Sequence, residues 1–150
     1  MPDTRYDTDF DAWARAQAAA LRAKDWIALD IDHLADEIEN LRKSERKAVR
    51  SHLGLLWLHL LKWMYQPEGR DRYGASWQAT ITYTRAFIDQ SLEDSPSLQP
   101  ELSRLAEEAY PWARRRAAKE TRLPLATFPE EAPWSLDQLQ DDDFLPEGVC

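Results

Sequence analysis

Residues 31–63 read IDHLADEIENLRKSERKAVRSHLGLLWLHLLKW, and their apolar pattern predicts the main helix of the chain. Steps of 3.6 residues keep one phase from Ile31 to Trp63, as in a helix with one apolar side. No proline interrupts the stretch, and its only glycine is Gly54. At ~1.5 Å per residue, a helix of this length spans about 50 Å. The pattern predicts one long helix over 31–65, bent near Lys43 and Ser44, with a tight hairpin at that point as the competing arrangement.

Further helices are predicted on both sides of the long one. The first runs from about 7 or 9 to 24, where alanine is dense. Gly69 and Gly74 with their charged neighbours predict a loop between Gln66 and Ser76, and Ser76 is a good cap for the next helix. Another helix begins near Leu98, and Pro111 is expected to kink or divide it.

The chain beyond residue 122 contains too much proline for a long helix. Ser135 and Gln138 have the spacing of a capping box, which predicts one short helix through Leu139. No run of β-branched residues alternates with period two. We therefore predict an all-α fold, a bundle of about four to five helices with one long helix. The chain is expected to be a single domain, 1–150, with the bundle over about 6–122 and an irregular, proline-rich arm over about 123–150.

Composition limits the classes of protein to which the chain can belong. It has 150 residues, with 19 Lys and Arg against 27 Asp and Glu, which gives a net charge of −8. Sixteen aromatic residues argue against disorder, and Cys150 alone cannot form an internal disulfide. The longest apolar stretch, 53–61, is interrupted by His59, so no membrane span is expected. The first five residues lack the pattern of a secretory signal, and a soluble cytoplasmic protein is predicted.

Several separated strings of residues together resemble one known family. They include Ala35–Leu41 (ADEIENL), 59–63 (HLLKW), 94–98 (DSPSL) and 123–125 (LPL), each in order along the chain. This combination resembles the bacterial helical proteins catalogued as domain of unknown function number 29, over about 6–146. The resemblance implies the helical fold and no activity. Arg122 stands where a helix-stopping glycine is expected before Leu123 and Pro124.

The histidines and their acidic neighbours are the candidate metal ligands. On a helix, His33 and Glu37 are four residues apart and face the same side, so they can share a metal ion. His52 joins them only if the chain folds back near Lys43 and Ser44. That arrangement would hold a divalent metal at His33, Glu37 and His52, whereas no other cofactor is expected. The alternative interpretation makes His52 and His59 hydrogen-bonded residues at the edge of the core.

Arg46 and His52 are separated by five residues, which resembles the short Arg-x4–6-His signature of helical HEPN-type ribonucleases. Basic residues also gather at 114–116, but a net charge of −8 repels a polyanion, and nucleic acid is not an expected partner. No Gly-x-Ser-x-Gly motif and no glycine-rich phosphate loop is present. Catalytic residues are therefore not assigned.

Polar side chains alternate with aromatic ones at the end of the long helix and across the following loop. Such a mixture can form the rim of a pocket, although packing of the aromatic rings explains the same pattern. The candidate rim consists of His59, Lys62, Trp63, Tyr65, Gln66, Trp77 and Arg85.

The long helix also carries charge in two blocks, acidic over 30–39 and basic over 42–50. Pairs within the helix explain much of this pattern, but two copies running antiparallel would also match in charge. The function expected is a non-catalytic protein-interaction or adaptor domain that binds a protein partner or a second copy of itself. The alternative is an enzyme, either the metal-dependent bundle or the ribonuclease that uses Arg46 and His52.

Overall fold

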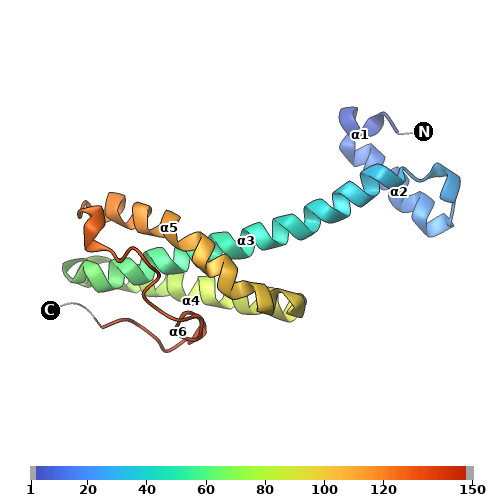
Figure 1. Ribbon diagram of the computed structural model, residues 1–150. Helices are drawn as coiled ribbons and strands as arrows, with labels where there is room; N and C mark the ends of the chain where they lie inside the picture. The colour runs from blue at the N-terminus through green and yellow to red at the C-terminus, as the bar shows by residue number, and fades with distance from the viewer. Residues whose placement is uncertain (1–2, 148–150) are drawn as a thin grey trace. The chain divides into compact units, whose positions relative to one another are not determined.

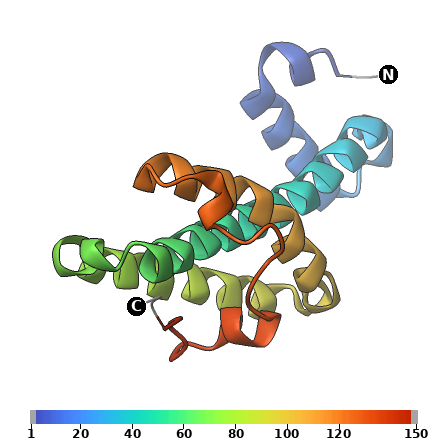
Figure 2. The same cartoon turned by 60° about the vertical axis from the view of Figure 1, so that its left-hand side comes forward.

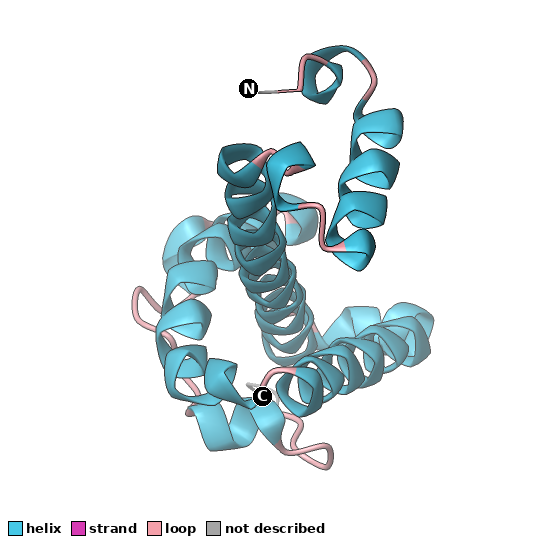
Figure 3. Cartoon of the chain, turned by 90° about the vertical axis from the view of Figure 1, so that its right-hand side faces the viewer, coloured by secondary structure: helices cyan, strands magenta, loops and turns pink. Residues whose placement is uncertain are grey.

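The computed structural model describes residues 3–147, and every regular element within them is a helix (Figures 1 and 3). This confirms the predicted all-α class. The α-helices are α1 (Arg5–Thr8), α2 (Phe10–Ala23), α3 (Ile31–Tyr65), α4 (Arg70–Asp94), α5 (Leu102–Thr121) and α6 (Leu136–Gln140). The 3-10 turns are η1 (Trp26–Ala28), η2 (Pro67–Gly69), η3 (Pro96–Glu101) and η4 (Leu125–Thr127).

The predicted long helix is present as α3, which runs for 35 residues without a break. The alternative hairpin at Lys43 and Ser44 is therefore not formed. The chain divides into two compact units within α3, one ending at Ser44 and one beginning at Glu45. We call the described parts of these units, 3–44 and 45–147, the N-terminal unit and the C-terminal unit.

The N-terminal unit consists of α1, α2, η1 and the first part of α3. Of the two starts predicted for the first helix, the one at Asp9 is correct, because α2 begins at Phe10 with Asp9 as its N-cap, and the short helix α1 precedes it. The Asp9 carboxylate caps α2 by accepting a hydrogen bond from the Ala12 N–H at 3.1 Å. Lys24 then ends α2 in the left-handed conformation, with φ 57°. The buried residues are few, and two of them, Gln17 and Asp30, are polar.

The C-terminal unit has a conventional apolar core. The second part of α3 contributes Leu53, Leu56 and Leu60, each fully buried, and α4 and α5 pack against it. Within this unit, α4 runs back beside the end of α3 after the short turn η2 (Figure 2). Trp57 joins α3 to α5 through a hydrogen bond from its indole N–H to the Ala106 carbonyl at 2.9 Å.

The predicted loop between Gln66 and Ser76 is wrong, because α4 already begins at Arg70. The Arg70 guanidinium donates to the Trp63 carbonyl at 2.7 Å and lies over the Trp63 ring at 4.9 Å. Gly74 lets the same ring come close, since a Cβ there would lie 3.5 Å from it. These contacts fix a helical turn where local composition indicated a loop, so Ser76 lies inside the helix instead of capping it.

Pro111 does not divide α5, which is continuous over 20 residues. The helix stays intact because its neighbours Ala109, Tyr110 and Ala113 are buried in the core, and this packing offsets the missing N–H. Arg122 ends α5 with φ 60°, the left-handed conformation that glycine adopts most easily. The helix thus stops where the family pattern predicts, although an arginine occupies the position.

The arm that follows α5 packs against the C-terminal unit. Phe128 and Leu139 are buried in the core, and Trp134 is half-buried against it. The predicted capping box is confirmed, since the Ser135 side chain accepts from the Gln138 N–H and the Gln138 side chain accepts from the Ser135 N–H. The residues 148–150 of the predicted arm lie outside the described part of the chain.

Candidate functional site

A row of large aliphatic side chains on the first part of α3 faces solvent in the N-terminal unit. Ile31 is 65% exposed, Ile38 is 66% exposed and Leu41 is 72% exposed. Leu34 lies between them and is half-buried. We call these four residues the apolar row. Soluble proteins seldom leave large apolar side chains exposed together without a partner for them.

The adjoining side of α3 is held by α1 and α2. The Tyr6 hydroxyl donates a hydrogen bond to Glu37 at 2.5 Å, and its ring stacks on His33 with centroids 3.8 Å apart. Because His33 and Glu37 occupy one flank of the helix, the apolar row lies beside these contacts and is not covered by them. The first part of α3 is thus fixed to the rest of the unit while its apolar side stays open.

A buried carboxylate organises the interior of this unit. Asp30 accepts hydrogen bonds from the Trp13 indole at 3.2 Å and from His33 Nδ1 at 2.7 Å. The hydrogen bond with His33 lowers the pKa of Asp30 to about 2 and raises the pKa of His33. Gln17 completes the network, since its side chain accepts from the Asp30 N–H at 2.7 Å. Polar contacts therefore organise the interior of the N-terminal unit, beside the apolar row.

Two more apolar residues of the same unit are exposed just before α3. They belong to η1, where Trp26 is 62% exposed and Ile27 is 98% exposed. Asp25 caps this turn through the Ala28 N–H, and the Gln17 amide donates to the Ala28 carbonyl at 3.3 Å. The turn is thus anchored by polar contacts while its two large side chains remain in solvent.

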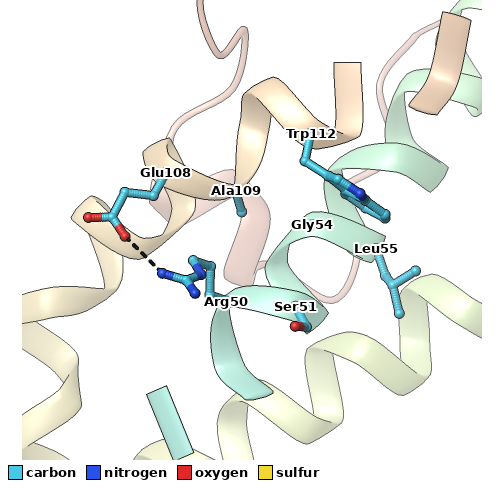
Figure 4. A pocket seen from close by; sticks show the side chains of 7 residues that line it. All are labelled: Arg50, Ser51, Gly54, Leu55, Glu108, Ala109 and Trp112. Atoms are coloured by element: carbon cyan, nitrogen blue, oxygen red, sulfur yellow. Dashed lines mark ion pairs between the residues drawn. The ribbon is translucent and has the colours of Figure 1, made fainter. Parts of the chain in front are cut away.

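The C-terminal unit contains a separate pocket of about 470 Å³ between α3 and α5 (Figure 4). Gly54 forms part of its wall, and a Cβ there would lie 3.1 Å from the Trp112 ring. Arg50 and Glu108 form an ion pair of 3.5 Å at its edge, and both side chains are partly exposed. The residues that line the pocket are Arg50, Ser51, Gly54, Leu55, Glu108, Ala109 and Trp112.

The candidate metal ligands have other partners. His33 binds Asp30, Glu37 binds Tyr6, and His52 donates Nδ1–H to the Ala48 carbonyl at 2.8 Å. Among residues 3–147, no group of three or more His, Cys, Asp or Glu side chains is arranged to hold a metal ion. The reversal of the chain on which the set His33, Glu37 and His52 depended is absent, because α3 is continuous.

His52 and His59 match the alternative interpretation, in which both are hydrogen-bonded residues at the edge of the core. His52 stacks on Phe87 with centroids 3.6 Å apart, and His59 donates Nδ1–H to the Leu55 carbonyl at 2.8 Å. Burial lowers the pKa of His59. Arg46, the arginine of the ribonuclease-like pair, makes a two-pronged contact with Glu101 at 2.7 and 2.5 Å. His52, His59 and Arg46 are therefore all engaged in contacts that hold the C-terminal unit together.

The structure brings part of the predicted pocket rim together. Lys62 forms an ion pair with Glu120 at 3.0 Å and lies 5.4 Å from the centre of the Trp77 ring. Trp77 is buried, and a Cβ at Gly69 would lie 2.6 Å from it, so its ring fills the space that a pocket would need.

The other members of the predicted rim pack elsewhere in the C-terminal unit. Trp63 contacts Arg70, and Tyr65 meets the Phe128 ring with centroids 5.3 Å apart. Gln66 forms the turn before α4, where its carbonyl accepts from the Gly69 N–H at 3.0 Å. His59 makes the backbone hydrogen bond given above.

Arg85 lies apart from the other candidates and anchors the C-terminal arm. Its guanidinium donates to the carbonyls of Leu139 at 2.8 Å and Gln138 at 3.2 Å, and it is 3% exposed. Arg114 acts similarly on the Phe128 carbonyl at 3.0 Å, and Arg116 pairs with Glu120 at 2.7 Å. Arg114 and Arg116, two of the basic residues that could have bound phosphates, therefore make contacts within the chain.

Sequence reasoning missed which half of α3 is covered and which is open. It also missed the pocket, although Gly54, alone in a long helix, was a signal for a close approach by another side chain. Trp112 gave no signal of its own, because one tryptophan among seven cannot be paired with a glycine without tertiary structure.

The fold places the chain among the all-α helical proteins, and no helix of the described chain is long and apolar enough to cross a membrane. Residues 5–145 match the model of the family described as "Domain of unknown function DUF29". Since this match covers nearly the whole chain, the protein belongs to that family, and the predicted resemblance is confirmed. Neither a curated protein nor a solved structure matches the chain.

Proposed function

We propose that the protein is a protein-interaction domain and that the apolar row of α3 is its docking surface. One observation supports this most directly: Ile31, Ile38 and Leu41 follow one side of a helix, and each is more than 60% exposed. Covering such a side chain completely stabilises a complex by about 1.5–3 kcal/mol. Three together supply the apolar centre of a specific interface.

The surrounding contacts support a surface built for binding. Tyr6, His33 and Glu37 fix the first part of α3 against α1, so little conformational freedom is lost when a partner covers the row. The charged neighbours Asp32, Arg42 and Lys43 are exposed and provide a polar border. An apolar centre with a polar border is the usual composition of a protein interface.

Site-specific photo-crosslinking tests the proposal in the cells that make the protein. A benzophenone amino acid at Ile38 should link the chain to one identified protein, because Ile38 is central in the row. The matched control is the same probe at Tyr83, which is 62% exposed on α4. No protein crosslink at Ile38, or equal crosslinking at both positions, would overturn the proposal.

A further inference from the structure

We infer that the partner on the apolar row is a second copy of this chain, with the two α3 helices antiparallel over 31–41. The inference rests on the proposed function, because it names the protein that covers that surface. It is carried by the spacing of the row, the side of the helix that is open, and the order of the charges along α3.

The spacing of the row is that of a coiled-coil seam. Ile31, Leu34, Ile38 and Leu41 are separated by three, four and three residues, which is the a-d-a-d pattern of two heptads. This spacing keeps apolar side chains on one narrow line between two helices, and it fits another helix with the same line. The following a position is Glu45, which accepts a hydrogen bond from the Ser95 hydroxyl at 2.7 Å within the C-terminal unit, so the seam ends at Leu41.

The contacts of the N-terminal unit leave only one flank of the apolar row open. In heptad terms Glu37 is a g residue, and the g flank is occupied by Tyr6 and by the ring of His33. The e flank, with Ala35 and Arg42, is exposed. Parallel helices place each e flank against a g flank, whereas antiparallel helices place e against e on one side of the seam and g against g on the other. The two open flanks meet in the antiparallel orientation, and the charges along α3 select it over the parallel one.

This orientation also matches the charges. The first part of α3 is acidic, and Arg42 and Lys43 follow it. When Ile31 of one copy lies level with Leu41 of the other, Leu34 lies level with Ile38. Arg42 of the second copy then lies two residues, about 3 Å along the axis, from the level of Asp32. Parallel copies would instead place acidic residues beside acidic residues.

The size of the side chains fits the same register. The two-fold axis passes at the level of residue 36, and on the open flank the nearest side chain to it is Ala35, which lets the helix backbones approach closely. In this register each of the four layers of the seam pairs an Ile of one copy with a Leu of the other. The resulting core is continuous over the whole apolar row.

Sedimentation of the full chain tests whether a second copy binds. Across micromolar concentrations the measured mass should rise to twice that of one chain. Ile38→Glu should return it to the mass of one chain, because the carboxylate of each copy would be buried against Leu34 of the other. Tyr83→Glu, at an equally exposed apolar residue outside the row, should leave the doubled mass unchanged. Circular dichroism verifies that both variants retain their helices.

Disulfide trapping tests the orientation. In a Cys150→Ser background, a chain with Ile31→Cys is mixed with a chain with Leu41→Cys and oxidised gently. Antiparallel pairing predicts the mixed disulfide and little of either homodimer, since residue 31 meets residue 41. Parallel pairing would give the two homodimers in preference and would overturn the inferred arrangement.

The outcomes separate this inference from the proposed function. A chain that keeps the mass of one copy at all concentrations, while Ile38 crosslinks to a different identified protein, overturns the second copy and supports the docking surface. The mass of one copy without any crosslink at Ile38 overturns both. A doubled mass that Ile38→Glu leaves intact shows that the copies meet elsewhere, and it overturns the inference.

Discussion

The two parts of α3 follow one helical repeat but have opposite surroundings. In the N-terminal unit, Ile31, Ile38 and Leu41 are more than 60% exposed, whereas Leu53, Leu56 and Leu60 of the C-terminal unit are fully buried. An amphipathic pattern therefore specifies which side of a helix is apolar and does not specify what covers that side. In one unit α4 and α5 cover that side, and in the other it faces solvent.

The interiors of the two units differ as well. The core of the C-terminal unit consists mainly of aliphatic side chains packed around Trp57, and this packing does not depend on charge. The N-terminal unit is held by Asp30 and its hydrogen bonds with Trp13 and His33, which depend on the protonation of both ionisable groups. We therefore expect the units to respond differently to truncation of side chains and to pH.

The largest effect is expected from alanine substitution at matched positions of α3. Leu60→Ala should lower the free energy of unfolding of the C-terminal unit by about 2–5 kcal/mol, because it leaves a cavity in a packed core. Ile38→Ala should change the stability of the monomer by less than about 0.5 kcal/mol, since the side chain is exposed. Hydrogen exchange along α3 in increasing urea measures both, and equal losses would remove the contrast between the units.

A smaller effect is expected from Arg85, the buried charge of the C-terminal unit. Arg85→Met should cost about 1–3 kcal/mol, because the carbonyls of Leu139 and Gln138 lose a buried donor. The loss should concentrate in α6, which should exchange its amide hydrogens faster than α4. Arg104→Met, on an exposed arginine, is the control and should leave α6 protected. Protection of α6 unchanged by Arg85→Met would contradict the role of Arg85 as its anchor.

The N-terminal unit should lose stability as pH rises. The hydrogen bond with Asp30 raises the pKa of His33 above its ordinary value of 6.5. The stabilisation that this pair gives the folded N-terminal unit is therefore fully present below pH 6.5 and is lost as pH rises through the raised pKa. The pKa of Asp30 is lowered from 3.8 to about 2, so its contribution is present above pH 3.8 and is lost as pH falls toward 2.

NMR titration of the His33 ring measures the first pKa directly, and thermal unfolding across pH measures its consequence. His33→Gln should abolish the loss of N-terminal stability between neutral and alkaline pH while leaving the C-terminal unit as it was. A His33 pKa at or below its ordinary value would contradict the strength given to its hydrogen bond with Asp30.

The smallest effect is expected at Gly54. Alanine favours a helix over glycine by about 1 kcal/mol, but the new Cβ would lie 3.1 Å from the Trp112 ring. Trp112 is 44% exposed and can shift, so Gly54→Ala should change stability by less than about 1 kcal/mol. Denaturant unfolding measures this, and a loss of several kcal/mol would show that Trp112 is held more firmly than its exposure indicates.

Much of the fold could be predicted because its signals are local. The unbroken period of α3, the capping box at Ser135 and the proline-rich arm are each written within a few residues. The start of α4 could not be predicted, because it depends on Arg70 binding a carbonyl of the preceding helix. The continuity of α5 through Pro111 depends likewise on burial of its neighbours in the core.

The candidate site was predicted less well than the fold. Blocks of charge and apolar residues on α3 were visible, and they indicated a binding helix. Which residues stay open was not visible, because coverage depends on where Tyr6, α2, α4 and α5 pack. The metal ligands and the predicted pocket rim were chosen by residue type, and the structure gives them hydrogen bonds, ion pairs and ring contacts that satisfy the same groups.

The helical class, the length of α3, the capping box at Ser135 and the family follow from the sequence, since helix periodicity and capping act over three to seven residues. Tertiary structure alone decided that Leu60 is buried while Ile38 is exposed, although both satisfy the same repeat. The physical reason is that burial depends on which surfaces meet, and those contacts join residues far apart in the chain.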